Sequence, residues 1–205
     1  SDTPRPGNAK FKKLTPVDPN STNPYQLTEA DRTVIGNTTP KFSGGFGLNA
    51  TYKGFDMSMF FNFMYDFDVL NANKIMLTTW ADNKENNFLM DIASDKRWRN
   101  FDDMGNEIRY SPEVLAEFNK NATMWNPTSI GRPICMSYAV EDGSFLRLNS
   151  ATLGYTLPSV WTKKVGLSKV RFYVSGNNLF TLTGYSGYDP EVNIATGLTP
   201  NIDYN

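Results

Sequence analysis

The string Tyr188-Asp189-Pro190-Glu191 holds two carboxylates close together, and a pair of carboxylates is what glycoside hydrolysis requires. Side chains that follow one another on an extended loop point apart, and no other acid or base accompanies this pair. A turn is therefore the better interpretation of the string. We predict that the chain is not an enzyme, and a glycosidase is the last of three functional hypotheses.

Oxygen-bearing side chains near the start of the chain are spaced like the ligands of a calcium loop: Asp18, Asn20, Thr22 and Glu29. The glycine that such a loop needs at its sharp turn is missing, because Asn23 stands there and Pro24 follows. A polar turn is the alternative. We predict no metal site and no cofactor, and keep Asp18, Asn20 and Glu29 as weak metal candidates.

The composition excludes several classes of function. The absence of histidine rules out His-based triads and most zinc sites. Cys135 is the single cysteine, so there is no intrachain disulfide, and we expect it to be a small buried or half-buried hydrophobe. A formal net charge of -1 without a basic block argues against nucleic-acid binding. No apolar run is long enough for a transmembrane helix.

Two long stretches, 41–53 and 55–68, alternate apolar and polar residues, which indicates β-strands. A tight turn at Lys53-Gly54, where glycine supplies a positive φ, joins them. The two apolar faces comprise Phe42, Phe46, Leu48, Ala50 and Tyr52, then Phe55, Met57, Met59, Phe61, Phe63, Tyr65 and Phe67. Ordinary strands have about five or six residues. Longer strands with a continuous apolar face are typical of outer-membrane β-barrels.

Alternation resumes over 144–183, where we predict two more barrel strands and a short periplasmic turn at 158–168. Arg147 and Asn149 are in phase with the apolar residues that follow them. A lipid-facing arginine is costly, so we expect that end of the strand to lie above the membrane. The turn holds residues suited to a membrane interface: Trp161, Lys163 and Lys164.

The remaining segments, 1–40, 69–143 and 184–205, are predicted to be loops. Short helices are expected inside the middle one, over 73–81 and after Ser111, where Pro112 suits a first helical position. Bacterial barrels place short turns in the periplasm and long loops outside. We therefore predict an all-β fold: an antiparallel transmembrane β-barrel fragment of about four long strands with long extracellular loops.

Four strands cannot close a barrel, and lipid does not tolerate open sheet edges. Residues 1–13 also lack the layout of a signal peptide, which an exported protein needs. We expect the chain to be a fragment of a larger polypeptide.

Eight strings occur in the order found in one family. They are Asp31-Arg32-Thr33-Val34-Ile35-Gly36-Asn37, Pro40-Lys41-Phe42, Gly44-Gly45-Phe46, Tyr52-Lys53-Gly54-Phe55-Asp56, Glu141-Asp142-Gly143-Ser144-Phe145-Leu146-Arg147-Leu148, Leu153-Gly154-Tyr155-Thr156-Leu157-Pro158, Asn177-Asn178-Leu179-Phe180-Thr181-Leu182-Thr183 and Tyr185-Ser186-Gly187-Tyr188-Asp189-Pro190-Glu191. Together they resemble the C-terminal barrel part of SusC/RagA-family TonB-linked outer-membrane transporters, except over 70–140.

The resemblance implies a large plugged barrel in the cell outer membrane that imports glycan or peptide fragments. It implies several partners: a SusD-like surface lipoprotein, the TonB complex, an oligosaccharide or peptide substrate, the lipid bilayer and the remainder of the same transporter chain. The plug, the TonB-contacting segment and the last barrel strand find no match here.

Aromatic side chains in the predicted extracellular loops are candidates for stacking on sugar rings or packing on a partner. The candidates are Trp80, Trp98, Tyr110, Trp125, Tyr185 and Tyr188. The alternative is that each one pins down a large ordered loop. The insert over 70–140 is favoured for contact with the lipoprotein, and the face with Asp56, Asn62, Asp66 and Asp68 is expected to line the lumen.

A soluble all-β carbohydrate-binding module is the second functional hypothesis. Such a sandwich has shorter strands at regular spacing, about every 8–12 residues. The long hairpin and the wide gap before residue 144 favour the transporter instead.

Overall fold

The computed structural model describes residues 5–23, 26–79, 88–93, 96–130, 134–191 and 202–203. The chain divides into two compact units. One combines Ser1–Ile35 with Asn71–Ala139, and the other combines Gly36–Leu70 with Val140–Asp203. We call them the helical unit and the sheet unit.

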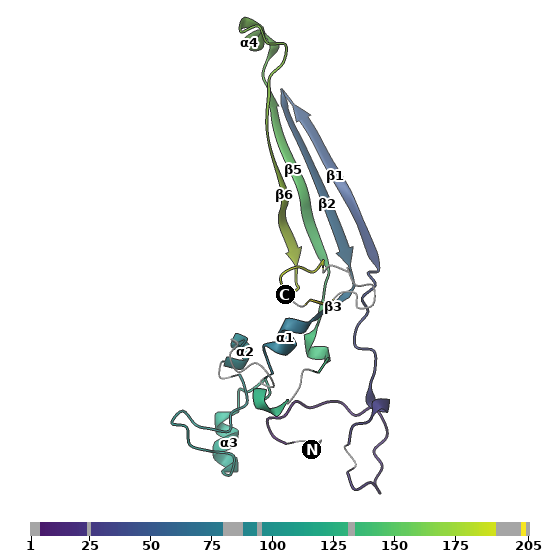
Figure 1. Cartoon of the computed structure of the whole chain (residues 1–205), viewed down its shortest axis with the longest axis vertical. Coiled ribbons are helices and arrows are strands. Elements are labelled where there is room, and N and C mark those ends of the chain that lie inside the picture. Colours follow the sequence, from purple (N-terminus) through teal and green to yellow (C-terminus); the bar gives the residue numbers. More distant parts are fainter. Residues whose placement is uncertain are drawn as a thin grey trace. The chain divides into compact units, whose positions relative to one another are not determined.

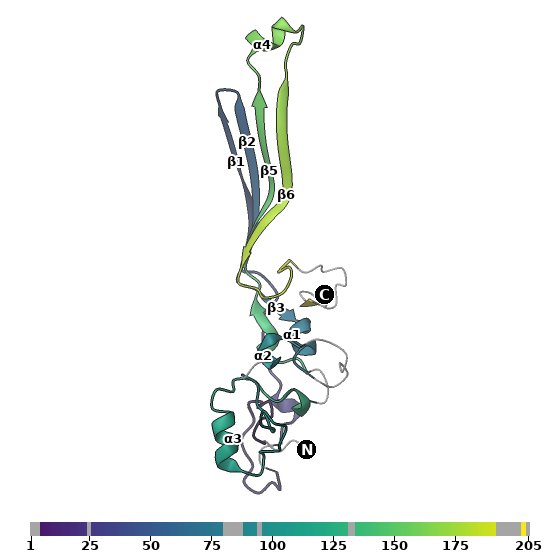
Figure 2. The same cartoon turned by 90° about the vertical axis from the view of Figure 1, so that its left-hand side faces the viewer.

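The sheet unit is built on a four-stranded antiparallel sheet in the order β1-β2-β5-β6 (Figure 1). Its strands are β1 (Phe42–Tyr52), β2 (Phe55–Tyr65), β5 (Phe145–Thr156) and β6 (Arg171–Thr183). Figure 2, turned by 90°, shows the same strands side by side. The predicted set of four long antiparallel strands is confirmed.

The β1–β2 turn has the geometry that right-handed strand twist favours. Lys53 and Gly54 have φ values of 47° and 90°, and two left-handed central residues define a type I′ turn. The predicted need for glycine at Gly54 is confirmed. A Cβ added there would also lie 2.8 Å from the carbonyl oxygen of Thr156 on β5.

The pairing register separates the sheet into an apolar face and a polar face. The apolar face carries Phe42, Phe46, Leu48, Tyr52, Phe55, Met57, Met59, Phe61, Phe63, Tyr65, Leu146, Leu148, Leu153, Tyr155, Phe172, Val174, Phe180 and Leu182. The polar face carries Asp56, Ser58, Asn62, Arg147, Ser150, Thr152, Arg171, Ser175 and Thr181, and with them the larger apolar or aromatic residues Phe60, Met64, Phe145 and Tyr173. Phe172 and Val174 are 64% and 66% exposed, so the described chain leaves these large apolar side chains mostly uncovered.

The apolar face has aromatic side chains at both ends. Phe55 packs against Tyr155 with ring centroids 4.5 Å apart, and Phe42 stacks on Tyr65 at the opposite end. At about 3.4 Å per residue, the strand from Phe55 to Tyr65 is about 34 Å long. A tilt of about 40° reduces its height to about 26 Å, close to the apolar band of outer-membrane barrels.

Two β-bulges reverse the alternation of side chains in the middle of the sheet. β5 has one more residue than β2 at the register shift after Phe60, and Asn149 is left outside the pairing. β6 in turn has an extra residue opposite β5, near Asn178, whose φ is 50°. The bulge moves Arg147 to the polar face, opposite Asn62 and Thr181. The prediction that Arg147 shares the phase of the following apolar residues was therefore wrong.

A second, three-stranded sheet lies in the same unit, in the order β4-β3-β7. Its strands are β3 (Asp68–Asn71), β4 (Val140–Asp142) and β7 (Ile202–Asp203). β4, β7 and all of β3 except Asp68 lie in segments predicted to be loops. Strands this short carry too little alternation to be recognised. Phe67, Val69, Phe145 and Tyr185 form a buried cluster in this unit.

The helical unit contains short helices: η1 (Glu29–Asp31), α1 (Ala72–Met76), α2 (Met90–Ala93), α3 (Pro112–Phe118), η2 (Pro127–Ser129) and η3 (Ser137–Ala139). α3 begins directly after Ser111, as predicted. α1 is shorter than the predicted helix over 73–81. The hydroxyl groups of Thr78 and Thr79 donate to the carbonyl oxygens of Lys74 and Ile75 at 2.7 and 3.1 Å, and such bonds compete with the helical pattern.

Asp56 and Arg171 form an ion pair across the polar face. Asp56 lies on β2 and Arg171 on β6, with Gly154 of β5 between them. The Nε of Arg171 donates to Asp56 at 3.0 Å. A Cβ on Gly154 would lie 2.5 Å from the guanidinium and 2.6 Å from the carboxylate, so only glycine leaves room for this bridge.

We predict that Gly154→Val separates this ion pair and destabilises the sheet by about 1–3 kcal/mol through overpacking. The measurement is the apparent unfolding temperature of the full-length protein in detergent. Thr152→Val, on the same face of the same strand, is the matched control and should change stability by about 0.5 kcal/mol or less. Equal unfolding temperatures for the two variants would contradict the prediction.

Candidate functional site

Arg147 organises the polar face where β5 and β6 meet the segment that follows β6. Its guanidinium forms ion pairs with Asp189 and with Glu191, the latter at 3.0 Å. Its Nε donates to the hydroxyl of Thr181 at 3.1 Å, and the group lies over the ring of Phe145. The side chain of Arg147 is 11% exposed, so the two carboxylates compensate a largely desolvated charge.

These contacts give the acidic string a structural role. Asp189 and Glu191 both bind one arginine, and Asp189 also accepts a hydrogen bond from the amide of Glu191 at 2.8 Å. Sequence reasoning interpreted the string as a turn and missed its partner. The signal in the sequence was Arg147 itself, a single arginine within an alternating apolar pattern. Its largely buried charge requires an acidic partner.

Hydrogen bonds to β4 hold the segment after β6 at a second place. The amide and the hydroxyl of Ser186 donate to the carboxylate of Glu141 at 3.0 and 2.8 Å. The hydroxyl of Thr183 donates to the carbonyl oxygen of Ser144 at 2.9 Å. The hydroxyl of Ser144 in turn donates to Asp142. The segment 184–191 is thus tied to β4 and β5 along its length.

The structure separates the two tyrosine candidates of this segment. Tyr185 is 6% exposed and packs with Phe67, Val69 and Phe145. Tyr188 is 85% exposed. Ser186 and Asp189, which lie on either side of it in the sequence, are held by Glu141 and Arg147. A rigidly mounted, exposed tyrosine is suited to contact a solute or a partner.

The candidates of the helical unit also differ in environment. Trp98 is half-buried against Gly7, and its indole nitrogen donates to Asn100 at 3.3 Å. Trp125 is half-buried, with its ring 4.9 Å from that of Tyr138. Tyr110 is 78% exposed. Trp80 lies outside the described residues.

The four acidic and amide residues predicted to line the lumen fall into two groups. Asp56 and Asn62 lie on the polar face. Asp66 follows β2 and pairs with Lys41, and Asp68 accepts the amide of Asn37 at 2.7 Å.

The weak metal candidates take part in local contacts. Asp18 accepts the amide of Asn20 at 2.9 Å, and Glu29 lies 3.6 Å from Arg32. In the part of the chain that the structure describes, no three His, Cys, Asp or Glu side chains are grouped to hold a metal ion. Cys135 is exposed, contrary to the expectation of a buried or half-buried side chain.

Asp31 is the polar centre of the N-terminal segment. Its carboxylate accepts the amides of Thr15 and Leu14 at 2.7 and 2.9 Å, and the amide of Thr28 at 2.9 Å. The hydroxyl of Thr15 adds a further bond at 2.7 Å. These donors, the amide of Thr15 foremost and that of Thr28 next, hold the pKa of Asp31 well below its usual range.

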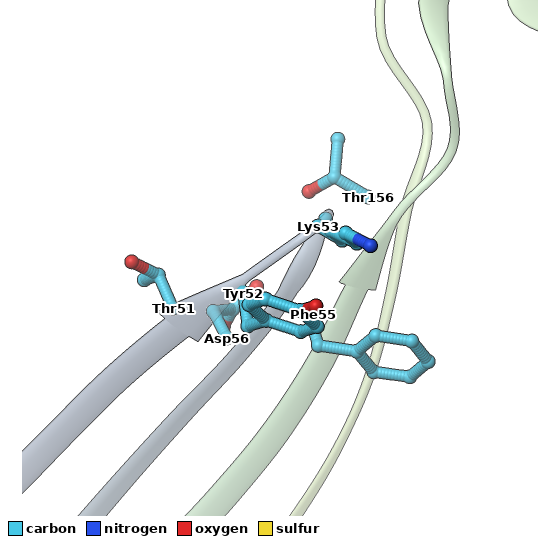
Figure 3. Close-up of a pocket in the computed structure, with 7 residues that line it drawn as sticks. Thr51, Tyr52, Lys53, Phe55, Asp56 and Thr156 are labelled. Carbon is cyan, nitrogen blue, oxygen red and sulfur yellow. The ribbon is translucent and has the colours of Figure 1, made fainter.

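A shallow open hollow surrounds the β1–β2 turn (Figure 3). It is lined by Thr51, Tyr52, Lys53, Gly54, Phe55, Asp56 and Thr156. The amide of Thr156 donates to the carbonyl oxygen of Gly54 at 2.7 Å, and Asp56 is engaged by Arg171. The hollow is an open gap beside a turn, and its lining residues form no arrangement of nucleophile and base.

Sequence relatives define the class of protein. TonB-dependent receptor P3 of Formosa agariphila is 36% identical over 168 residues, which are 82% of this chain and 14% of the receptor. TonB-dependent receptor P39 of the same organism is 27% identical over 175 residues, 84% of this chain and 15% of the receptor. The chain therefore spans about 14–15% of the length of these curated relatives. No family model matches it.

Solved structures define the fold. The RagAB peptide transporter matches with a TM-score of 0.59 at 23% identity, over 80% of this chain and 15% of that one. The RagAB peptide importer in its open-open state matches with a TM-score of 0.60 at 23% identity, over 90% and 18%. The open sheet matches part of a RagA-like β-barrel.

The fold and the relatives together define the class of TonB-dependent outer-membrane receptors. Within that class the described sheet has the fold of a stretch of RagA-like barrel, in agreement with the resemblance of its sequence strings, and the predicted outer-membrane localisation is confirmed. No helix among the described residues is long and apolar enough to cross a membrane.

We predict that Arg147→Gln releases the segment 184–191, because two carboxylates lose their cation. Hydrogen bonds to charged groups contribute about 1.5–3 kcal/mol each, so hydrogen exchange of peptides from this segment should accelerate at least tenfold. Asp189→Asn leaves the pair with Glu191 intact and should give a smaller acceleration. Equal exchange in the wild type and Arg147→Gln would contradict this role.

The pKa of Asp31 predicts a pH dependence of the contacts at Leu14 and Thr15. A carboxyl group whose folded-state pKa is depressed contributes its full stability above its unfolded pKa of about 3.9 and loses it as the pH falls further. Hydrogen-exchange protection of these amides should be constant down to about pH 5 and decline below about pH 4. Asp31→Asn should have weaker protection without this decline, and a decline already near neutral pH would contradict the assignment.

Proposed function

We propose that this chain is part of a TonB-dependent importer whose barrel wall includes β1, β2, β5 and β6. The single observation that carries the proposal is the two-faced sheet. One face is apolar and carries largely exposed side chains on all four strands, such as Leu48, Leu153 and Val174, while the other carries the charged groups. The names of the relatives and of the RagAB importer support import as the activity.

The orientation follows from the lengths of the connections. The β1–β2 turn and the β5–β6 connector are short and lie at one end of the sheet, whereas the segments at the other end are long. Short turns face the periplasm in bacterial barrels. We propose that the segments 1–40, 69–143 and 184–205 are extracellular and that 158–168 is a periplasmic turn.

The proposed cargo is a glycan or peptide fragment, and a peptide is what RagAB is named for. A SusD-like lipoprotein is the proposed partner at the extracellular segments, and the TonB complex acts through a part of the transporter outside this chain. Tyr188 and Tyr110 are the proposed contacts, because their side chains are largely exposed.

A soluble carbohydrate-binding sandwich is less consistent with the structure. A sandwich covers the apolar face of each sheet with a second sheet. Here Phe172, Val174 and Leu182 remain 60–66% exposed within the described chain, on a face that would not be stable in water.

Opposite faces of β2 give a direct test of the membrane assignment. Met59 lies near the middle of the apolar face, and Ser58 lies next to it on the polar face. In the full-length transporter, Met59→Arg should destabilise the barrel by about 2–4 kcal/mol, because arginine at mid-bilayer is costly. Ser58→Arg, the matched control, should be tolerated.

The measurement is the amount of transporter in the outer membrane and its migration on electrophoresis without boiling, which reports a folded barrel. Equal sensitivity of the two positions would contradict the lipid-facing assignment.

A second prediction concerns Tyr188. Tyr188→Ala should lower uptake of a labelled oligosaccharide or peptide, or retention of the lipoprotein, without changing stability by more than about 0.5 kcal/mol. Tyr185→Ala removes a buried ring and should destabilise the protein by about 3–5 kcal/mol. Uptake and lipoprotein retention both unchanged in Tyr188→Ala would exclude this residue as a contact.

A further inference from the structure

The connector between β5 and β6 contains an ordered helical turn that the sequence pattern did not predict. α4 (Ser159–Lys164) ends in the hydrogen bonds of a Schellman motif. The amides of Gly166 and Leu167 donate to the carbonyl oxygens of Lys163 and Thr162 at 3.1 and 3.0 Å. Gly166 has a φ of 74°, as the motif requires. The connector therefore has a defined conformation.

This ordered turn presents large apolar side chains to the outside. Val160, Trp161, Val165 and Leu167 are 68%, 60%, 70% and 51% exposed. A tightly folded turn of this size does not need four such residues at its surface for its own stability. The group, which we call the α4 patch, is therefore suited to an apolar surrounding.

The apolar face of the sheet extends to the start of the connector that carries the α4 patch. The amide of Leu157 donates to the carbonyl oxygen of Val170 at 2.9 Å, so the β5–β6 ladder extends beyond Thr156 and Arg171. By alternation, Leu157 and Val170 follow Tyr155 and Phe172 on the apolar side. Figures 1 and 2 show α4 directly beyond the ends of β5 and β6.

The connector carries a net positive charge. Residues 157–170 include Lys163, Lys164 and Lys169 and no aspartate or glutamate. All three lysines are exposed. Lysine beside exposed tryptophan and aliphatic side chains is the composition of a segment that lies in the headgroup region of an anionic bilayer.

We infer that the α4 patch is a lipid anchor: Val160, Trp161, Val165 and Leu167 insert into the periplasmic leaflet, and Lys163 and Lys164 bind the phosphates of anionic phospholipids. The inference rests on the proposed orientation, in which this end of the sheet faces the periplasm. A connector held in this way fixes the β5–β6 hairpin at the level of the bilayer surface.

The test places a nitroxide spin label at Val165→Cys in the full-length transporter, with Cys135 and other exposed cysteines replaced. The transporter is reconstituted in bilayers of phosphatidylcholine with and without phosphatidylglycerol. Collisions with oxygen report lipid exposure, and collisions with a water-soluble nickel chelate report water exposure. Labels at Leu153→Cys on the apolar face and Met104→Cys, which is 90% exposed in the helical unit, are the lipid and water references.

The expected result is a Val165 label that is accessible to oxygen and shielded from nickel, and more so with phosphatidylglycerol. A Val165 label as accessible to nickel as that at Met104 would overturn the anchor. A label shielded from both relaxants would also overturn it, since it would indicate a protein partner. If the Leu153 label is not lipid-exposed, the barrel proposal itself fails, so the two failures are distinguishable.

The lysines are tested in the same spin-labelled transporter. Lys163→Glu with Lys164→Glu should abolish the effect of phosphatidylglycerol, because each lysine near an anionic surface contributes about fivefold to binding. Lys163→Arg with Lys164→Arg keeps the charge and should retain the effect. An unchanged effect in the double glutamate variant would show that the lysines do not bind the anionic lipid.

Discussion

A strand that crosses a bilayer must keep every charge on the side away from lipid, and the rest of this sheet depends on that constraint. Arg147 satisfies it only because Asn149 is an extra residue in β5. Without the bulge, the alternation that places Leu153 and Tyr155 on the apolar face would place Arg147 there as well. A matching irregularity near Asn178 lets β6 follow, so the apolar face remains continuous across all four strands.

Whether a feature could be predicted from the sequence depends on whether it is set by neighbouring residues or by contacts between distant segments. The long strands, the turn at Gly54 and the start of α3 depend on local periodicity or on one residue's backbone preference, and the sequence was sufficient for them. The face of the sheet on which Arg147 lies depends on one unpaired residue, Asn149. A single extra residue cannot be recognised from the alternation of the sequence. The burial of Tyr185 and the pairing of β3 with β4 depend on contacts between distant segments, which no local pattern contains.

Several of the strings that carry the family resemblance contain residues that connect strands to neighbouring segments through hydrogen bonds or close packing. Asn37 and Asp68 exchange backbone and side-chain hydrogen bonds at 2.7 Å, and Gly143 passes against Phe67 and Val69 where a Cβ would clash. Ser144 and Glu141 fasten the segment after β6. The resemblance therefore identifies the architecture of the sheet, because these residues hold its strands and connections together.

The connectivity of the sheet also bears on the order of assembly. β1–β2 and β5–β6 are hairpins of near neighbours, but β2 pairs with β5 across the whole segment between Tyr65 and Phe145. Contacts between distant residues form late, because loop closure must precede them. We therefore expect the two hairpins to form first and the pairing of β2 with β5 to follow. Because Asp56 reaches Arg171 across that pairing, their ion pair would mark its completion during folding.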